Sequence, residues 1–184
     1  ISQASASTDY NAYGSLFQWG RYSDGHELIN WISDIASDDA ELANKTSTAS
    51  PTTTVGHGDF IISNANWYVG TSPAPDTLWQ GEAGINNPCP QGYRLPTEAE
   101  YILETSSWSS SNSEGALASP LKITLPAYRT FGSSSSLAGT STRGDYWTST
   151  ASGNTSTTFN VFPTVTQFPS QARVYGMSVR CIKD

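Results

Sequence analysis

Charged residues are scarce in this chain, and basic residues are the scarcer kind. Asp, Glu, Lys and Arg make up only 14% of the 184 residues, against about 25% in typical soluble domains. Sixteen acidic and nine basic residues give a net charge of −7, and no two basic residues are adjacent. Because such a chain repels phosphate backbones, the composition argues against nucleic acid as a partner.

Long apolar runs are also missing. The longest, such as 60–62, fall far short of the roughly 18 residues needed to span a bilayer, so we expect no membrane-spanning segment. The sequence opens at Ile1 with neither an initiator methionine nor a hydrophobic leader. We therefore expect a mature product whose leader has been removed, or an excised segment.

Histidine is limited to two residues, His26 and His57, and these lack the spacing of an iron or zinc site. A serine nucleophile would need one of them as its base, and the sequence contains no Gly-x-Ser-x-Gly elbow. We therefore expect no catalysis and no metal centre, and we interpret both histidines as structural hydrogen-bonding residues.

Cysteine is equally scarce, and Cys89 and Cys181 either form one disulfide or remain buried free thiols. A disulfide would close a loop of about 90 residues and contribute about 4–5 kcal/mol on the chain-entropy model. The rest of the composition favours an oxidising compartment and therefore the disulfide. Asn44 and Asn154 begin N-glycosylation triplets, a weak signal in a chain rich in Ser and Thr.

Hydroxyl groups and aromatic rings take the place of the missing charges. The chain has 28 serines and 21 threonines, together with 6 Trp, 9 Tyr and 6 Phe. A disordered linker would lack these rings, which bury large apolar areas, so we expect a folded chain. The composition suits an extracellular surface protein built from short strands and many turns.

Local patterns predict an α+β fold with short mixed and antiparallel strands, two short helices and long loops. Thr97 and Glu100 form a capping box that predicts a helix over about 98–106. Apolar residues at helical spacing predict another helix over 24–36. The helix over 98–106 is expected to bury Tyr101, Ile102 and Leu103. The predicted strands cover 16–19, 60–62, 122–125, 128–131, 145–150, 158–162 and 175–182.

Three blocks of sequence carry a family resemblance: 13–26, 78–98 and 144–184. They contain the runs Leu-Phe-Gln-Trp-Gly-Arg, Asn-Pro-Cys-Pro-Gln-Gly-Tyr-Arg-Leu-Pro-Thr-Glu and Gly-Asp-Tyr-Trp-Thr-Ser-Thr. In order and spacing the blocks resemble the Fibrobacter succinogenes major paralogous domain, a family of bacterial surface and secreted proteins. The resemblance covers 13–184 as a single domain. It leaves 1–12 as a flexible or strand-donating N-terminal arm, and it implies an extracellular or cell-surface location.

The resemblance also implies a C-type-lectin-like fold, shared with formylglycine-generating-enzyme domains. In such folds the helix after the Arg-Leu-Pro-Thr run packs on a small sheet formed partly by the terminal strand, which would bring Cys89 close to Cys181. The reactive cysteine pair and the histidine triad of the related enzymes have no counterpart here. The resemblance therefore implies a module without catalytic activity.

The calcium motifs of C-type lectins, Glu-Pro-Asn, Gln-Pro-Asp and Trp-Asn-Asp, do not occur. Calcium remains a weak alternative, because Asp34, Asp38, Asp39 and Glu41 offer oxygen ligands, but a solvated helix end and loop is the simpler interpretation. No other cofactor is expected.

A ligand site is predicted from aromatic platforms and neighbouring polar groups. The stretch 143–145 spells Arg-Gly-Asp, for which chance is the simpler explanation as an integrin motif. In lectin-fold receptor-binding proteins, however, the loops around this strand contact ligands. The predicted ligand-binding residues are Trp67, Tyr68, Arg143, Asp145, Tyr146 and Asn154.

Two functions from different classes follow. The leading hypothesis is a non-catalytic adhesion or recognition module whose partner is a glycan or a surface protein. The alternative is a subunit that self-assembles into an extracellular filament or coat, since few surface charges need desolvation and the arm 1–12 can add as a strand to a neighbour. A receptor-binding tip of a phage or secretion apparatus would use the same fold.

Overall fold

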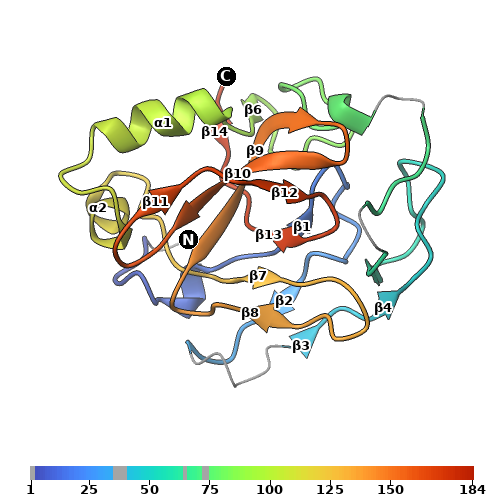
Figure 1. Ribbon diagram of the computed structural model, residues 1–184, viewed down its shortest axis with the longest axis horizontal. Helices are drawn as coiled ribbons and strands as arrows, with labels where there is room; N and C mark the ends of the chain where they lie inside the picture. Colours follow the sequence, from blue (N-terminus) through green and yellow to red (C-terminus); the bar gives the residue numbers. More distant parts are fainter. Residues whose placement is uncertain (1–2, 35–40, 64–65, 72–74) are drawn as a thin grey trace.

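The computed structural model describes residues 3–34, 41–63, 66–71 and 75–184. Short strands and long loops dominate, with two α-helices, α1 (Glu98–Ser106) and α2 (Ser113–Ala118). Two 3-10 turns are η1 (Tyr10–Ala12) and η2 (Pro75–Thr77). Both α-helices lie on one side of the molecule, and the long loops around β4 lie on the other (Figure 1). The α+β class is confirmed.

Two four-stranded antiparallel sheets form the body. The first has the order β1-β13-β7-β8, and the second is built on the β9–β10 hairpin, with β11 and β12 both on the outer edge of β10. The strands of the first sheet are β1 (Phe17–Gln18), β7 (Tyr128–Arg129), β8 (Leu137–Ala138) and β13 (Gly176–Met177). Those of the second are β9 (Gly144–Ser152), β10 (Thr155–Val161), β11 (Thr166–Gln167) and β12 (Ser170–Ala172).

Three two-stranded ladders complete the described strands. The antiparallel ladders are β2 (Ile29–Asn30) with β3 (Glu41–Leu42), and β6 (Tyr93–Arg94) with β14 (Ile182–Lys183). The parallel ladder joins β4 (Lys45–Thr46) to β5 (Phe60–Ile61). None of the helices in the described ranges combines the length and the apolar character that a membrane crossing requires.

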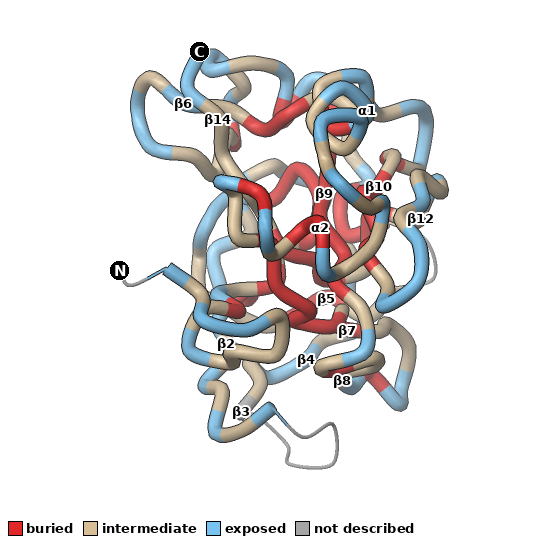
Figure 2. Tube along the Cα trace, turned by 90° about the vertical axis from the view of Figure 1, so that its left-hand side faces the viewer, coloured by how far each residue is buried: buried red, intermediate tan, exposed pale blue. Residues whose placement is uncertain are grey.

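Strand β9 separates two hydrophobic clusters, the first around Trp19 and Trp147 and the second around Tyr101 and Phe159. Successive side chains of a strand point to opposite faces, so Tyr146 packs with α1 residue Tyr101 and Phe159, while Trp147 packs with Trp19. The buried segments, among them β9, β5 and β7, run through the middle of the molecule (Figure 2). Strand β9 therefore lies at the centre of the fold, and it contains the strand predicted over 145–150.

Indole hydrogen bonds fix the first cluster. The Nε1–H of Trp19 donates to the carbonyl of Thr148, that of Trp147 to the carbonyl of Phe17, and that of Trp67 to the carbonyl of Trp19, each at 2.7 Å. Buried tryptophans are stabilised when the N–H finds such a partner. These bonds tie β1 to β9 and place Trp67 in the core.

The disulfide and the capped helix are confirmed. Cys89 and Cys181 are bonded, with their Cα atoms 5.8 Å apart. Thr97 and Glu100 make both bonds of the capping box at the start of α1. The guanidinium of Arg94 donates to the Glu100 carboxylate at 2.7 Å and lowers the pKa of that group to about 2.

The predicted helix over 24–36 is wrong within the residues that the structure describes. Gly25 has φ +107, outside the helical region, and residues 29–30 form β2 instead. Leu28 and Ile32 are exposed, so their spacing does not mark a buried helical face. Residues 35–36, at the end of this prediction, lie outside the described part of the chain.

Helix α1 buries less than expected. Only Tyr101 is buried, and Ile102 and Leu103 are exposed, because the helix packs on the body along a single narrow stripe. Helix α2 was not predicted from the sequence. It begins where the Asn112 side chain accepts the backbone N–H groups of Glu114 and Gly115.

Two of the predicted strands differ from the strands in the structure. The stretch 122–125 is not a strand, since Lys122 adopts φ +50. The terminal stretch 175–182 divides into β13 and the start of β14, which pair with different partners. Within the arm, residues 3–12 contain η1 and no strand, and the carbonyl of Ser7 accepts the N–H of Leu125 at 2.8 Å.

Candidate ligand-binding site

Burial changes the role of the two aromatic residues predicted as platforms. Trp67 is fully buried and Tyr68 is 2% exposed, and their ring centroids lie 5.5 Å apart within the first cluster. The fully buried ring of Trp67 presents no open face for stacking on a sugar. Tyr146 is also buried, and its hydroxyl donates to the carbonyl of Thr124 at 2.9 Å.

The Arg-Gly-Asp triplet is folded inward. Asp145 is fully buried and accepts a hydrogen bond from Arg143 Nη2 at 2.8 Å. The guanidinium carbon of Arg143 also lies 4.6 Å from the ring centroid of Tyr128 and 5.0 Å from that of Phe162. A triplet whose carboxylate is buried and paired with its own arginine is not presented to an integrin.

Two of the six predicted residues line the same hollow. Asn154, exposed in the turn between β9 and β10, and Tyr68 line one open hollow of about 480 Å³. Of the acidic group considered for calcium, Asp38 and Asp39 lie outside the described residues. The carbonyl of Asp34 accepts a hydrogen bond from the Ser141 hydroxyl.

A different hollow, which no sequence pattern indicated, is lined by aromatic, apolar and hydrogen-bonding side chains. Three loops, 20–27, 53–59 and 84–87, meet around a volume of about 510 Å³, which is in the range of small-molecule sites. These lining side chains include Tyr22, Asp24, Thr53, His57, Ile85 and Asn86.

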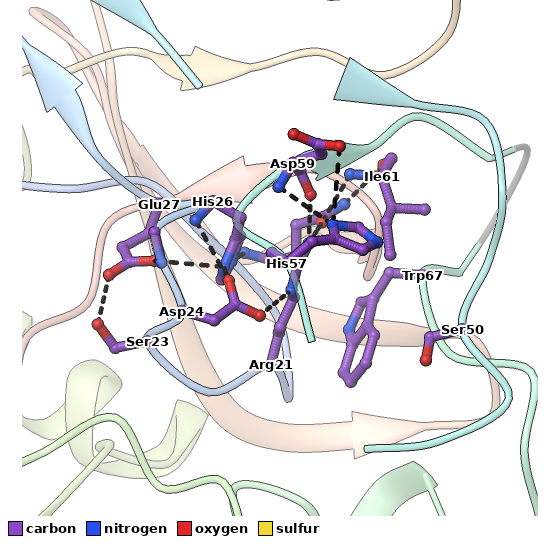
Figure 3. A network of polar contacts seen from close by, with 12 residues as sticks. Arg21, Ser23, Asp24, His26, Glu27, Ser50, His57, Asp59, Ile61 and Trp67 are labelled. Carbon is purple, nitrogen blue, oxygen red and sulfur yellow. Dashed lines mark hydrogen bonds and ion pairs between the residues drawn. The ribbon is translucent and has the colours of Figure 1, made fainter. Parts of the chain in front are cut away.

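Arg21 joins two of these loops from beneath. It is fully buried and donates to the carbonyls of Asp59 and His57 at 2.9 and 2.8 Å, and to the Asp24 carboxylate at 2.8 Å. These contacts place Asp24, Arg21 and His57 side by side in Figure 3. Burial lowers the pKa of Arg21, while the charge of Asp24 acts in the opposite direction.

Asn86 joins the third loop to the other two. Its side-chain amide donates to the carbonyl of Gly20 at 2.8 Å and to that of Thr53 at 3.2 Å. Gly58 lies against Gly25, and a Cβ on Gly58 would stand 3.0 Å from the carbonyl oxygen of Asp24. The three loops therefore form a pre-organised frame, with little conformational entropy left to lose on binding.

His26 has one clear protonation state. Its Nε2 accepts the backbone N–H of Gln18 at 3.1 Å, so the single proton of the neutral ring is on Nδ1, which donates to Asp24 at 2.7 Å. Burial lowers the pKa of His26 and favours this neutral form. The expectation that His26 is a structural hydrogen-bonding residue agrees with this geometry.

The same geometry decides whether a metal fits here. Asp24, His26 and Glu27 offer ligand atoms within 4.8 Å of one another, the only such group in the described ranges. However, both ring nitrogens of His26 are already used, and Glu27 accepts hydrogen bonds from the Ser23 hydroxyl and from the N–H of Gly25. A metal would have to break these bonds, so the cluster is better suited to holding the loop than to ligating an ion.

The open side of the hollow combines an aromatic surface with a donor and an acceptor. Tyr22 is 57% exposed and Ile85 is 62% exposed at its rim. One oxygen of the Asp24 carboxylate receives a single hydrogen bond, from Arg21. His57 Nδ1 accepts the N–H of Asp59 at 3.2 Å, so its neutral ring carries the proton on Nε2 as a donor.

The charge of Asp24 is secured by its neighbours. Burial acts to raise the pKa of Asp24, but the hydrogen bond from His26 and the charge of Arg21 outweigh it and lower that pKa below its usual value. Asp24 is therefore ionised at neutral pH and able to accept a hydrogen bond from a hydroxyl group. Comparison with known proteins finds no match among family models, curated proteins or solved structures.

Proposed function

We propose that this chain is a non-catalytic secreted or cell-surface recognition module that binds a neutral glycan in the hollow beside Tyr22. The exposed Tyr22 ring beside a donor and an acceptor carries the proposal. Sugars present an apolar ring face to aromatic side chains, and their neighbouring hydroxyls pair with a donor and an acceptor. The carboxylate of Asp24 and the imidazole of His57 supply these two polar groups.

The wider chemistry of the chain supports the same proposal. A disulfide suits an oxidising compartment, and the resemblance to bacterial surface proteins with a C-type-lectin-like fold suits an extracellular module. Because Asp24 is already neutralised by Arg21 and hydrogen-bonded to His26, the hollow favours uncharged hydroxyl groups over a cationic ligand.

A glycan array tests this proposal. The wild-type chain, Tyr22→Ala and a matched control, Tyr93→Ala, are compared on the same array; Tyr93 is 39% exposed and lies outside the hollow. We expect neutral glycans to bind the wild type and the control, and binding to Tyr22→Ala to fall roughly tenfold or more because the stacking surface is lost. Equal binding by all three, or no glycan bound by the wild type, contradicts the proposal.

The filament alternative remains a prediction. Exposed Leu28 and Ile32 offer apolar contacts to a second copy. The arm residues 3–12 are folded against their own body, through the bond between Ser7 and Leu125, so strand donation would require this contact to break. Electron microscopy of the native material distinguishes ordered fibres from discrete monomers.

A further inference from the structure

A third hollow lies where the N-terminal segment meets the end of the chain. Residues 11–15 line one side and 178–180 the other, around a volume of about 400 Å³. A smaller hollow of about 320 Å³ adjoins it, and Ala12 and Arg180 line both. The larger hollow shares no lining residue with the one beside Tyr22.

The charge of these two hollows is opposite to that of the chain. The net charge is −7, yet the charged residues that line the hollows are Arg180 and Lys122, and none of their described lining residues is acidic. The carboxylate of Asp9 lies outside the lining and accepts a hydrogen bond from Asn11 at 3.4 Å. A positive concave surface on an acidic protein favours an anionic ligand.

Arg180 is held in place without a carboxylate. Its Nη2 donates to the carbonyls of Leu121 and Lys122 at 2.7 and 3.1 Å, and its Nε has no partner among the described residues. Lys122 adopts φ +50, a conformation uncommon for a residue other than glycine, next to this contact. Four other arginines pair with carboxylates in the described structure: Arg21, Arg94, Arg143 and Arg173.

Ser178 gives a second, independent sign of a ligand. It lines the larger hollow and is 2% exposed, and its Oγ has no hydrogen-bond partner in the part of the chain that the structure describes. Buried hydroxyls are nearly always bonded. A hydroxyl and a guanidinium with unused donors beside one hollow are the groups that recognise a carboxylate.

We propose that this hollow binds the carboxylate of an acidic sugar, a uronic acid. Arg180 and Ser178 would donate to the carboxylate, and Asn11 and Ser15 would face the ring hydroxyls. The partly exposed ring of Phe17 also lines this volume and would contact the apolar face of the sugar ring. The site is independent of the proposed function, because its residues do not belong to the hollow beside Tyr22.

Calorimetric titration with D-galacturonate, and with D-galactose and inorganic phosphate as comparison ligands, tests the proposal. We expect galacturonate to bind the wild type and Tyr22→Ala equally, and Ser178→Ala to weaken binding roughly tenfold, because one hydrogen bond to a charged group is lost. Galactose and phosphate should each bind at least tenfold more weakly than galacturonate.

A second variant, together with melting temperatures, separates binding from folding. Arg180→Lys keeps the positive charge but loses the planar fork, so we expect both variants to bind galacturonate more weakly. Ser178→Ala should keep the wild-type melting temperature, because its Oγ bonds nothing in the described structure, whereas Arg180→Lys loses bonds to two carbonyls and should melt at a lower temperature. Equal affinities for galacturonate and galactose, or unchanged affinity in both variants, overturn the proposal. Tighter binding of phosphate than of galacturonate also overturns it, since the site would then select an anion without regard to the sugar.

Discussion

At the scale of single residues, burial decides the chemistry of Asp145. One carboxylate oxygen accepts hydrogen bonds from Arg143, and the other has no partner among the described atoms. Burial raises the pKa of Asp145 from 3.8 to about 6, although Arg143 counteracts it. The folded state therefore binds this proton more tightly than the unfolded chain does.

This shift predicts a pH dependence of stability. Because the raised pKa belongs to the folded state, the contribution of Asp145 is greatest below about pH 4 and is lost as the pH rises to about 6, by up to about 3 kcal/mol. Urea unfolding at pH 4 and pH 7 should show that Asp145→Asn removes this part of the loss.

The control for this measurement is internal. His26 has a lowered pKa, so its contribution runs the other way and is lost as the pH falls below its unfolded value of about 6.5. Only the difference between wild type and Asp145→Asn isolates the carboxyl group. Identical pH slopes in the two proteins would show that Asp145 is not the group responsible.

At the scale of elements, the start of α1 could be predicted from a local signal, whereas features that depend on packing could not. The capping box of Thr97 and Glu100 involves four consecutive residues, so the start of α1 could be read from the sequence. The apolar spacing around Leu28 is an equally local pattern, but Gly25 and the pairing of β2 with β3 override it. Helix α2 lacks an apolar pattern, and only its Asn112 cap marks its start.

Close packing around Gly115 in α2 predicts that a larger residue there lowers stability. A Cβ on Gly115 would lie 1.9 Å from the backbone oxygen of Ser110, so alanine here must displace the loop before the helix. Despite the better helix propensity of alanine, we expect Gly115→Ala to lower the free energy of unfolding by about 1–3 kcal/mol. Urea denaturation measures this change.

Glu114→Ala is the matched control, one residue away on the exposed side of the same helix. Its effect should stay within about 0.5 kcal/mol, as is usual for surface substitutions. If Gly115→Ala proves as stable as the wild type, the close approach of Ser110 to the helix is not a real constraint on this element.

At the scale of the whole molecule, the fold brings together residues that no sequence pattern connects. Arg21, His57 and Asn86 come from three separate loops, and their carbonyl and amide contacts build the hollow. The sequence marked Trp67 and Tyr146 as binding residues because aromatic rings suit both cores and sugar sites. Only their burial separates these two roles, and burial depends on the assembled fold.

The disulfide could be inferred because the chain has only two cysteines and a composition that suits an oxidising compartment. It joins Cys89 to Cys181 next to the β6–β14 ladder, and so connects the segment before α1 to the end of the chain. The exposed Tyr22 had a weaker signal, a single aromatic residue between the charged Arg21 and Asp24, and its neighbours across the hollow could not be predicted.

Mapping a bound neutral glycan by NMR shows whether it occupies the hollow beside Tyr22. The best ligand from the array is titrated into isotope-labelled protein, and chemical-shift changes are assigned along the chain. We expect the largest changes at Tyr22, Asp24, His57 and Ile85, which line the hollow. Changes confined to the face around Asn154, with none at Tyr22, would contradict this expectation.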